Sequence, residues 1–210
     1  MDLLKQKCEI LSRDKSDINE HLPTLYKYAL ECNSVFETGV RGVISSYALL
    51  YGLMQNKNNN TKKMLLNDIT QCNLTDFLNI SKNLDISINY VWKNNLEIVF
   101  DENETYDLVF IDTWHIYGQL KRELIKFSKI TNKYIIMHDT EVDKIHGETI
   151  RCGWNAIEQS KQSGFTVEEI NKGLEPAITE FLLNNSNWKI KEKFTNNNGL
   201  TILEKIDITI

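Results

Sequence analysis

The apolar residues of this chain fall into short continuous runs separated by longer segments of helical spacing. The strongest run is Leu108-Val109-Phe110-Ile111, with four apolar residues in succession. A strand covered on both faces requires such a run, whereas a strand with one solvated face alternates. We therefore expect a largely parallel sheet, with strands ending near residues 36, 66, 91, 112 and 137.

Segments with apolar residues at helical spacing lie between these strands. Two helices are expected before the first strand, and Pro23 fits the first turn of the second helix. The chain closes with alternating runs at residues 188–194 and 200–204, joined by Asn198-Gly199, a strong hairpin signal. The remaining helices are expected over residues 44–50, 76–80, 119–128, 154–161 and 174–183.

Composition and charge fit a single domain. A chain of 210 residues with 41% hydrophobic content can build a full core, so residues 1–210 are expected to form one unit, with N-terminal helices within 1–33. The net charge of -5 argues against nucleic-acid and membrane-surface partners. No apolar segment approaches membrane-spanning length, and the four cysteines form no C-x-x-C pair. We expect reduced cysteines and a cytoplasmic protein.

Residues 141–173 have a looser pattern than the rest of the chain. A long insertion after a strand that carries polar residues is a candidate lid. Its charged pair, Glu148 and Arg151, either faces a site or is solvated, and solvation is the commoner outcome for such residues.

The turn after the first strand is the first candidate ligand site. The run ETGVRG at residues 37–42 follows an apolar pair and precedes a helical pattern. Glycine lets the backbone approach a ligand, and a helix N-terminus presents free N–H groups. A dinucleotide fingerprint has G-x-G-x-x-G and an acid roughly twenty residues later, whereas here the acid comes first. Glu37 would repel a pyrophosphate and attract an ammonium group.

Polar residues also follow the later strands. Asp68 ends the second strand, where one carboxylate can accept hydrogen bonds from both hydroxyls of a ribose. Trp92 ends the third strand and packs either on adenine or in the core, which is the commoner role. The fourth and fifth strands bring further acids and histidines to the ligand-binding edge of the sheet: Asp112, His115, His138 and Asp139.

Together these motifs resemble the class I S-adenosylmethionine (SAM) dependent methyltransferases. The resemblance covers residues 17–203 and is carried by E-T-G-V-R-G, Y-D-L-V-F-I-D-T-W-H, Y-I-I-M-H-D-T and N-N-N-G-L-T-I-L in this order. Arg41 stands where the family has its middle glycine. The chain is most similar to small bacterial and viral members that accompany glycan biosynthesis. It is more distantly similar to metal-dependent sugar O-methyltransferases and cephalosporin-hydroxylase-like proteins.

The resemblance implies a Rossmann-like α/β fold, a mostly parallel seven-stranded sheet with an antiparallel terminal hairpin. It implies SAM as the cofactor and O-methylation of a hydroxyl on a sugar or glycan precursor, and it leaves open whether the chain forms a homo-oligomer. The implied cofactor site consists of Glu37, Thr38, Gly39, Arg41, Gly42, Ser45, Asp68, Trp92, Asp112 and Trp114.

Methyl transfer from a sulfonium requires in-line alignment and removal of the acceptor's proton. Asp112 and Asp139 offer oxygen ligands suited to Mg²⁺, with His138 added if the ion resembles Mn²⁺. Such an ion would also relieve the repulsion between the two carboxylates. With or without such an ion, His115 or His138 could serve as the base, since a neutral imidazole is available at pH 7. The candidate catalytic residues are thus His115, His138 and Asp139.

Other functional classes stay open. One is a non-catalytic SAM-fold binding module or a hydroxylase-like relative, and an iron hydroxylase would need two histidines and one carboxylate that converge. The other is an NAD-type oxidoreductase, which the missing G-x-G-x-x-G disfavours.

Overall fold

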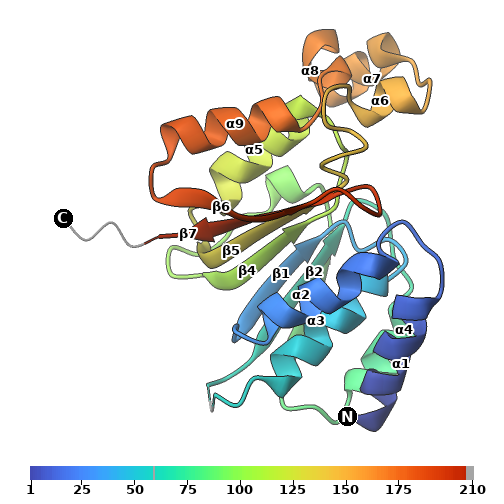
Figure 1. The fold of residues 1–210 in the computed structure, drawn as a ribbon, viewed down its shortest axis with the longest axis vertical. Helices are drawn as coiled ribbons and strands as arrows, with labels where there is room; N and C mark the ends of the chain where they lie inside the picture. The colour runs from blue at the N-terminus through green and yellow to red at the C-terminus, as the bar shows by residue number, and fades with distance from the viewer. Residues whose placement is uncertain (59, 207–210) are drawn as a thin grey trace.

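The computed structural model describes residues 1–58 and 60–206 and contains one seven-stranded sheet, in the order β3-β2-β1-β4-β5-β7-β6 (Figure 1). Strands β1 to β5 run parallel, and β7 is antiparallel to both of its neighbours. The fold predicted from the sequence, with its antiparallel terminal hairpin, is confirmed. The strands are β1 Ser34–Thr38, β2 Lys63–Asp68, β3 Ser87–Trp92, β4 Tyr106–Ile111, β5 Thr131–His138, β6 Trp188–Phe194 and β7 Leu200–Lys205.

Helices cover both faces of the sheet, α2 and α3 on one face and α5 and α9 on the other (Figure 1). The apolar run in β4 is divided between these layers. Leu108 and Phe110 belong to the core with α2 and α3, whereas Val109 and Ile111 belong to the core with α5 and α9. The helices are α1 Asp2–Arg13, α2 Leu22–Ala29, α3 Ile44–Gln55, α4 Thr75–Ser81, α5 Tyr117–Phe127, α6 Glu148–Arg151, α7 Ala156–Ser163, α8 Val167–Asn171 and α9 Glu175–Asn184, with 3-10 turns η1 Asn19–His21 and η2 Asn95–Glu97. None of the described helices is both long and apolar enough to cross a bilayer.

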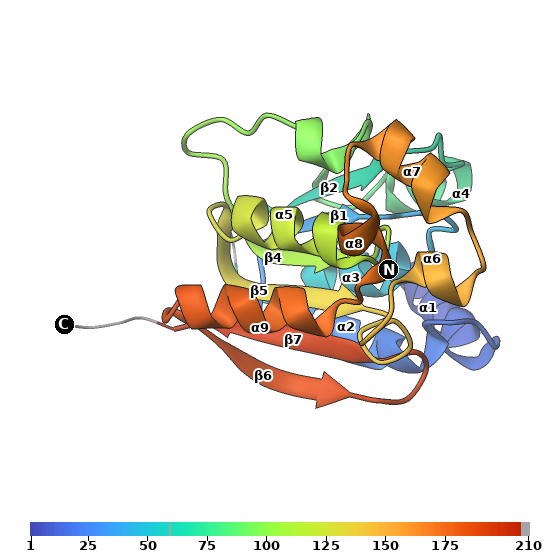
Figure 2. The same ribbon diagram turned by 90° about the horizontal axis from the view of Figure 1, so that it is seen from above.

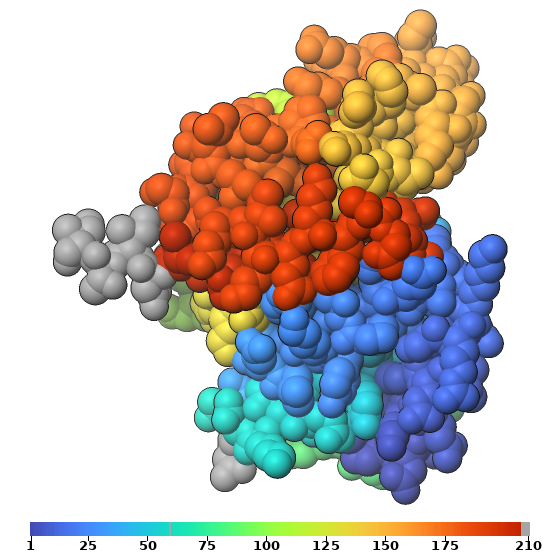
Figure 3. Space-filling model, in the orientation of Figure 1, coloured from blue at the N-terminus to red at the C-terminus, as the bar shows by residue number. Residues whose placement is uncertain are grey.

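The insertion at residues 141–173 folds into three short helices, α6, α7 and α8, where one helix was expected. These helices project at one end of the molecule, the yellow and orange lobe in Figure 3. Helix α7 buries none of its side chains. Helix α8 begins with a capping box, in which Thr166 and Glu169 bond to each other's backbone N–H groups. That spacing is visible in the sequence and could have identified the helix.

The turn between β1 and α3 has three residues in the left-handed region: Gly39 at φ 90°, Arg41 at φ 39° and Val43 at φ 63°. Arg41, which replaces the middle glycine of the resembled motif, therefore keeps a backbone conformation that glycine adopts easily. Gly39 has a steric requirement as well, because a Cβ there would lie 1.8 Å from the carbonyl oxygen of Asp112. At Gly42 the nearest atom would be a side-chain carbon of Ile44 at 3.8 Å.

The two glycines give a matched stability test. Gly39→Ala should lower the free energy of unfolding by about 3 kcal/mol or more, because it combines a backbone clash with an unfavourable φ. Gly42→Ala should change it by less than about 1 kcal/mol, since the added methyl meets no backbone atom. Urea denaturation measures both. Equal effects would show that the turn does not pack on β4 as described.

Candidate functional site

A cleft of about 870 Å³ opens at the carboxyl ends of β1, β2 and β4. The turn after β1 and the end of β2 form its floor, η2 and the loop before it form one wall, and residues 112–115 form another. The insertion at residues 141–173 supplies the outer side through Glu148, Trp154 and residues 162–165. Its expected function as a lid stays a prediction, and we refer to the insertion as the lid below. Figure 2 shows α8 beside the start of α5. The cleft therefore lies at the sheet edge where the sequence placed the ligand.

Six of the ten implied cofactor residues line this cleft: Thr38, Gly39, Arg41, Asp68, Asp112 and Trp114. The other four do not. Gly42 is an exposed residue of the turn, and Ser45 is buried in the first turn of α3. Trp92 is 60% exposed on the edge strand, where its indole N–H donates to the carbonyl of Ile69. Ile69 and Leu96 are the apolar residues that line the cleft in that region.

Glu37 lies beneath the cleft, fully buried. Phe36, Glu37 and Thr38 alternate across the sheet, so Glu37 shares the α3 face with Val35 while Thr38 faces the opposite layer. One carboxylate oxygen of Glu37 accepts a hydrogen bond from Ser45 in the first turn of α3, and the other has no partner among the described residues. Burial raises the pKa of Glu37 to about 7. The structure thus gives Glu37 a position supporting the turn, with no side-chain surface in the cleft.

Asp68 is 7% exposed and ties together two loops of the cleft floor. Its Oδ2 accepts the backbone N–H of Arg41 at 2.8 Å, and its Oδ1 accepts both the N–H and the hydroxyl of Thr70, at 2.7 and 2.8 Å. A carboxylate has about four acceptor sites, so these bonds leave little capacity for a ligand. Its predicted contact with both ribose hydroxyls stays a prediction.

A cluster of acids surrounds His115 at the end of β4. The Nε2 atom of His115 lies 3.2 Å from Asp112 Oδ1. Its Nδ1 atom lies 3.0 Å from Asp139 Oδ2, 3.4 Å from Asp143 Oδ2 and 3.6 Å from Glu148 Oε2. The structure therefore brings the predicted Asp112, His115 and Asp139 together, and adds two acids from the lid.

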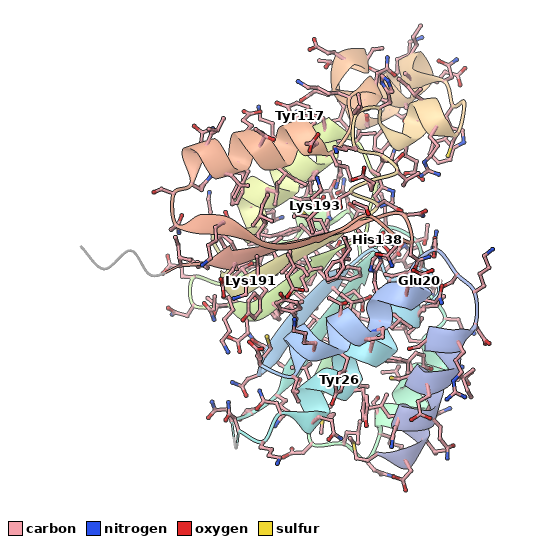
Figure 4. All side chains as sticks on the ribbon, in the orientation of Figure 1. Glu20, Tyr26, Tyr117, His138, Lys191 and Lys193 are labelled. Carbon is pink, nitrogen blue, oxygen red and sulfur yellow. The ribbon has the colours of Figure 1, made fainter. Side chains whose placement is uncertain are left out.

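His138 belongs to the same cluster and is its most deeply buried histidine, with 1% of its surface exposed. Its Nε2–H donates to the carbonyl of Asn197 at 3.2 Å, and its Nδ1 faces Asp112 Oδ1 at 3.3 Å. Asn197 also accepts the backbone N–H of Glu20 through its side chain. The β6–β7 turn thus connects the N-terminal segment to His138, and Figure 4 shows Glu20 and His138 at this end of the sheet.

The charged groups of the cluster shift one another's pKa values. Burial would lower the pKa of His115, but the hydrogen bond to Asp112 and the nearby carboxylates of Asp143 and Asp139 raise it well above its ordinary value. The pKa of His138 is also raised by Asp112, against the effect of burial. Burial would raise the pKa of Asp112, but the two histidines hold it well below its usual range. Burial raises the pKa of Asp139, although the charges of the two histidines act in the opposite direction. The expected role of either imidazole as a base stays a prediction.

Of the two acids that the insertion adds to the cluster, Asp143 was missed in the sequence, whereas Glu148 was expected either to face a site or to be solvated. Asp143 is fully buried and forms a two-pronged ion pair with Arg151, at 2.7 and 2.8 Å. Glu148 lines the cleft, and its backbone N–H donates to the carbonyl of His115. Glu148 therefore faces the cleft, whereas Arg151 is exposed, pairs with Asp143 and does not line the cleft. No local signal in the loose pattern of the insertion indicates Asp143.

The cluster has donor sets suited to a divalent ion. Asp112, His138 and Asp139 form one set and His115, Asp139 and Asp143 another, with ligand atoms within 4.8 Å of one another in each. Asp139 takes a left-handed φ of 57°, and its buried Oδ1 has no hydrogen-bond partner among the described residues. A mixed nitrogen and oxygen set fits Mn²⁺ better than Mg²⁺, which prefers oxygen alone.

Comparison with known proteins gives the fold. No protein-family model and no curated sequence matches the chain. Among solved structures, the Podospora anserina methyltransferase PaMTH1 bound to S-adenosylhomocysteine (SAH) has a TM-score of 0.57 at 13% identity, over 99% of this chain and 89% of that chain. The Streptomyces achromogenes O-methyltransferase TomG, in complex with SAM, has a TM-score of 0.59 at 10% identity, over 90% and 81%.

A third neighbour is the magnesium protoporphyrin IX methyltransferase of Synechocystis PCC 6803 with bound SAH. Its TM-score is 0.55 at 15% identity, over 95% of this chain and 91% of that chain. At such identities the likeness concerns architecture. The chain has the fold of the class I SAM-dependent methyltransferases.

Proposed function

We propose that the chain is a SAM-dependent O-methyltransferase that methylates a hydroxyl of a sugar or glycan precursor. The observation that carries the proposal is the position of the His115 cluster, at the wall of a cleft that occupies the ligand-binding edge of this fold. The fold neighbours that hold SAM or SAH support the choice of cofactor. The motifs of the sequence support the glycan-related acceptor.

The floor of the cleft fits the cofactor. The backbone of Gly39 and Arg41 would approach the methionine part, and Asp68 would lie near the ribose. Ile69 and Leu96 offer apolar contact for a planar base. SAM supplies an activated methyl group when bound, so the protein has only to align it with the acceptor and handle one proton.

The opposite end of the cleft fits a hydroxylated acceptor. Trp154 and Gln159 of the lid and Glu148 of the cluster line it together. Carboxylate and amide groups accept and donate the hydrogen bonds that several hydroxyls require, and an aromatic face packs against the apolar side of a sugar ring. Of these residues, Glu148 lies 3.6 Å from His115, whose side chain is 12% exposed at the cleft wall.

A divalent ion is part of the proposal, with Asp112, His138 and Asp139 as its ligands. Such an ion would supply Lewis-acid polarisation that lowers the pKa of the acceptor hydroxyl. The carboxylates around His115 raise its pKa. An ion that neutralises their charge would lower this pKa, so that His115 would lose its proton to solvent and its neutral imidazole could then accept the proton of the acceptor.

One observation favours a second candidate, a hydroxylase-like oxygenase. Such enzymes hold iron with two histidines and one carboxylate, and the structure brings both His115 and His138 within 3.3 Å of Asp112 Oδ1. Oxygen consumption in the presence of Fe²⁺ would support this alternative. Methyl transfer without oxygen consumption supports the proposed function.

The proposed cofactor site predicts different effects on SAH binding for substitutions at two buried carboxylates, Asp68 and Glu37. Asp68→Asn should raise the Kd for SAH on the order of tenfold, because it alters a charged acceptor at the cleft floor. Glu37→Gln should leave this Kd close to that of the wild type, because its side chain does not reach the cleft. Calorimetric titration measures both. A strong loss in Glu37→Gln with no change in Asp68→Asn would contradict the placement of the cofactor.

The proposed metal site predicts that substitution of one ligand lowers turnover and leaves cofactor binding unchanged. Asp139→Asn should lower kcat on the order of a hundredfold and leave the Kd for SAH unchanged, because Asp139 belongs to the cluster and does not line the cofactor floor. Chelation should abolish activity, and Mn²⁺ should restore it. Glu158→Gln on the exposed side of α7 is the control. Full activity after chelation would exclude the metal and leave a histidine base.

A further inference from the structure

One face of α5 is hydrogen-bonded to the η2 segment, which follows β3 and forms one wall of the cleft. Gln119, Glu123 and Lys126 recur at helical spacing on this face and all bond to the η2 segment. Lys126 Nζ donates to three backbone carbonyls there, those of Asn95, Leu96 and Ile98, at 2.6 to 2.8 Å. This wall is therefore fixed to the helix.

Glu123 is the centre of this network and is fully buried. Its Oε1 accepts three hydrogen bonds, from the amide of Asn95 at 2.5 Å, the hydroxyl of Thr113 at 2.7 Å and the amide of Gln119 at 2.8 Å. Burial raises the pKa of Glu123, whereas these three donors stabilise the charged form. Nothing in the proposed methyl transfer uses this carboxylate.

The network fixes the orientation of the Gln119 amide. Its Nε2 donates both to Glu123 Oε1 and to Asn95 Oδ1, the latter at 3.0 Å, so both amide hydrogens are used. The reverse orientation would place the amide oxygen against the carboxylate. Gln119 is 8% exposed and lines the cleft, and its Oε1 has no hydrogen-bond partner among the described residues. The cleft thus has one fixed, unused acceptor at this wall.

A hydrogen-bond acceptor that is held in one orientation favours a ligand that presents a hydrogen-bond donor to it. We propose that Gln119 Oε1 accepts a hydrogen bond from the 6-amino group of the cofactor's adenine, and that Glu123 acts as a positioning residue that holds the amide. The nearby Ile69 and Leu96 provide apolar contact for the base. Adenine carries a donor at position 6, whereas hypoxanthine carries an oxygen there, which Gln119 would repel. This inference rests on the proposed function, because it requires an adenosyl ligand.

The test compares SAH with S-inosylhomocysteine by calorimetric titration. The wild type should bind SAH tighter on the order of tenfold or more, since a mismatched polar pair at a buried site is strongly rejected. In Gln119→Met this preference should fall close to one, through weaker binding of SAH. Gln162→Met, a lid glutamine of the same cleft, is the matched control and should keep the wild-type ratio.

A second variant distinguishes the orientation of the Gln119 amide by Glu123 from a general structural defect of the site. Glu123→Gln lets residue 123 offer either amide atom, so Gln119 can turn and present its NH₂ group to the cleft. Binding of S-inosylhomocysteine should then tighten while binding of SAH weakens, whereas a merely structural defect weakens both. An unchanged ratio in both variants, with SAH binding retained, overturns this inference alone. Failure of the wild type to bind SAH overturns the proposed function together with it.

Discussion

The repulsion among four carboxylates around one imidazole is the constraint on which the site depends. Asp112, Asp139, Asp143 and Glu148 all approach His115, and the fold must supply positive charge to keep them there. Arg151 supplies part of that charge through its ion pair with Asp143. The acids in turn raise the pKa of His115 and His138, which favours the charged imidazoles. The same concentration of negative charge makes the cluster suited to a divalent ion. Two of the four acids come from the lid, so the electrostatics of the cluster also hold the lid to the sheet.

The proposed cofactor side of the cleft is stabilised differently, by close backbone packing and by hydrogen bonds of the Glu123 carboxylate and the Lys126 ammonium. Gly39 packs against the carbonyl of Asp112, which sets the turn after β1 directly beside the acid cluster. The α5 network fixes the opposite wall through Glu123 and Lys126. A rigid floor and wall next to a charged centre allow donor and acceptor to be aligned with little further ordering, which is the main requirement for methyl transfer.

Sequence patterns predicted the strands because each has a strong local signature. The four-residue apolar run of β4 and the Asn198-Gly199 turn are such signatures, and parallel pairing then brings Asp112, His115, His138 and Asp139 to one edge. Side-chain direction was harder to predict. Alternation along β1 places Glu37 on the α3 face, whereas the motif alone suggested the ligand side. Asp143 could not be predicted, because only the tertiary fold of an irregular insertion brings it to His115.

The most direct test of the account is the ligand preference of the wild-type protein. Calorimetric titration with SAH should show saturable binding at one site, with a negative heat-capacity change from burial of the cofactor in the cleft. Titration with NAD under the same conditions should show none, because the turn after β1 lacks the pyrophosphate fingerprint. Binding of NAD without binding of SAH would contradict the account.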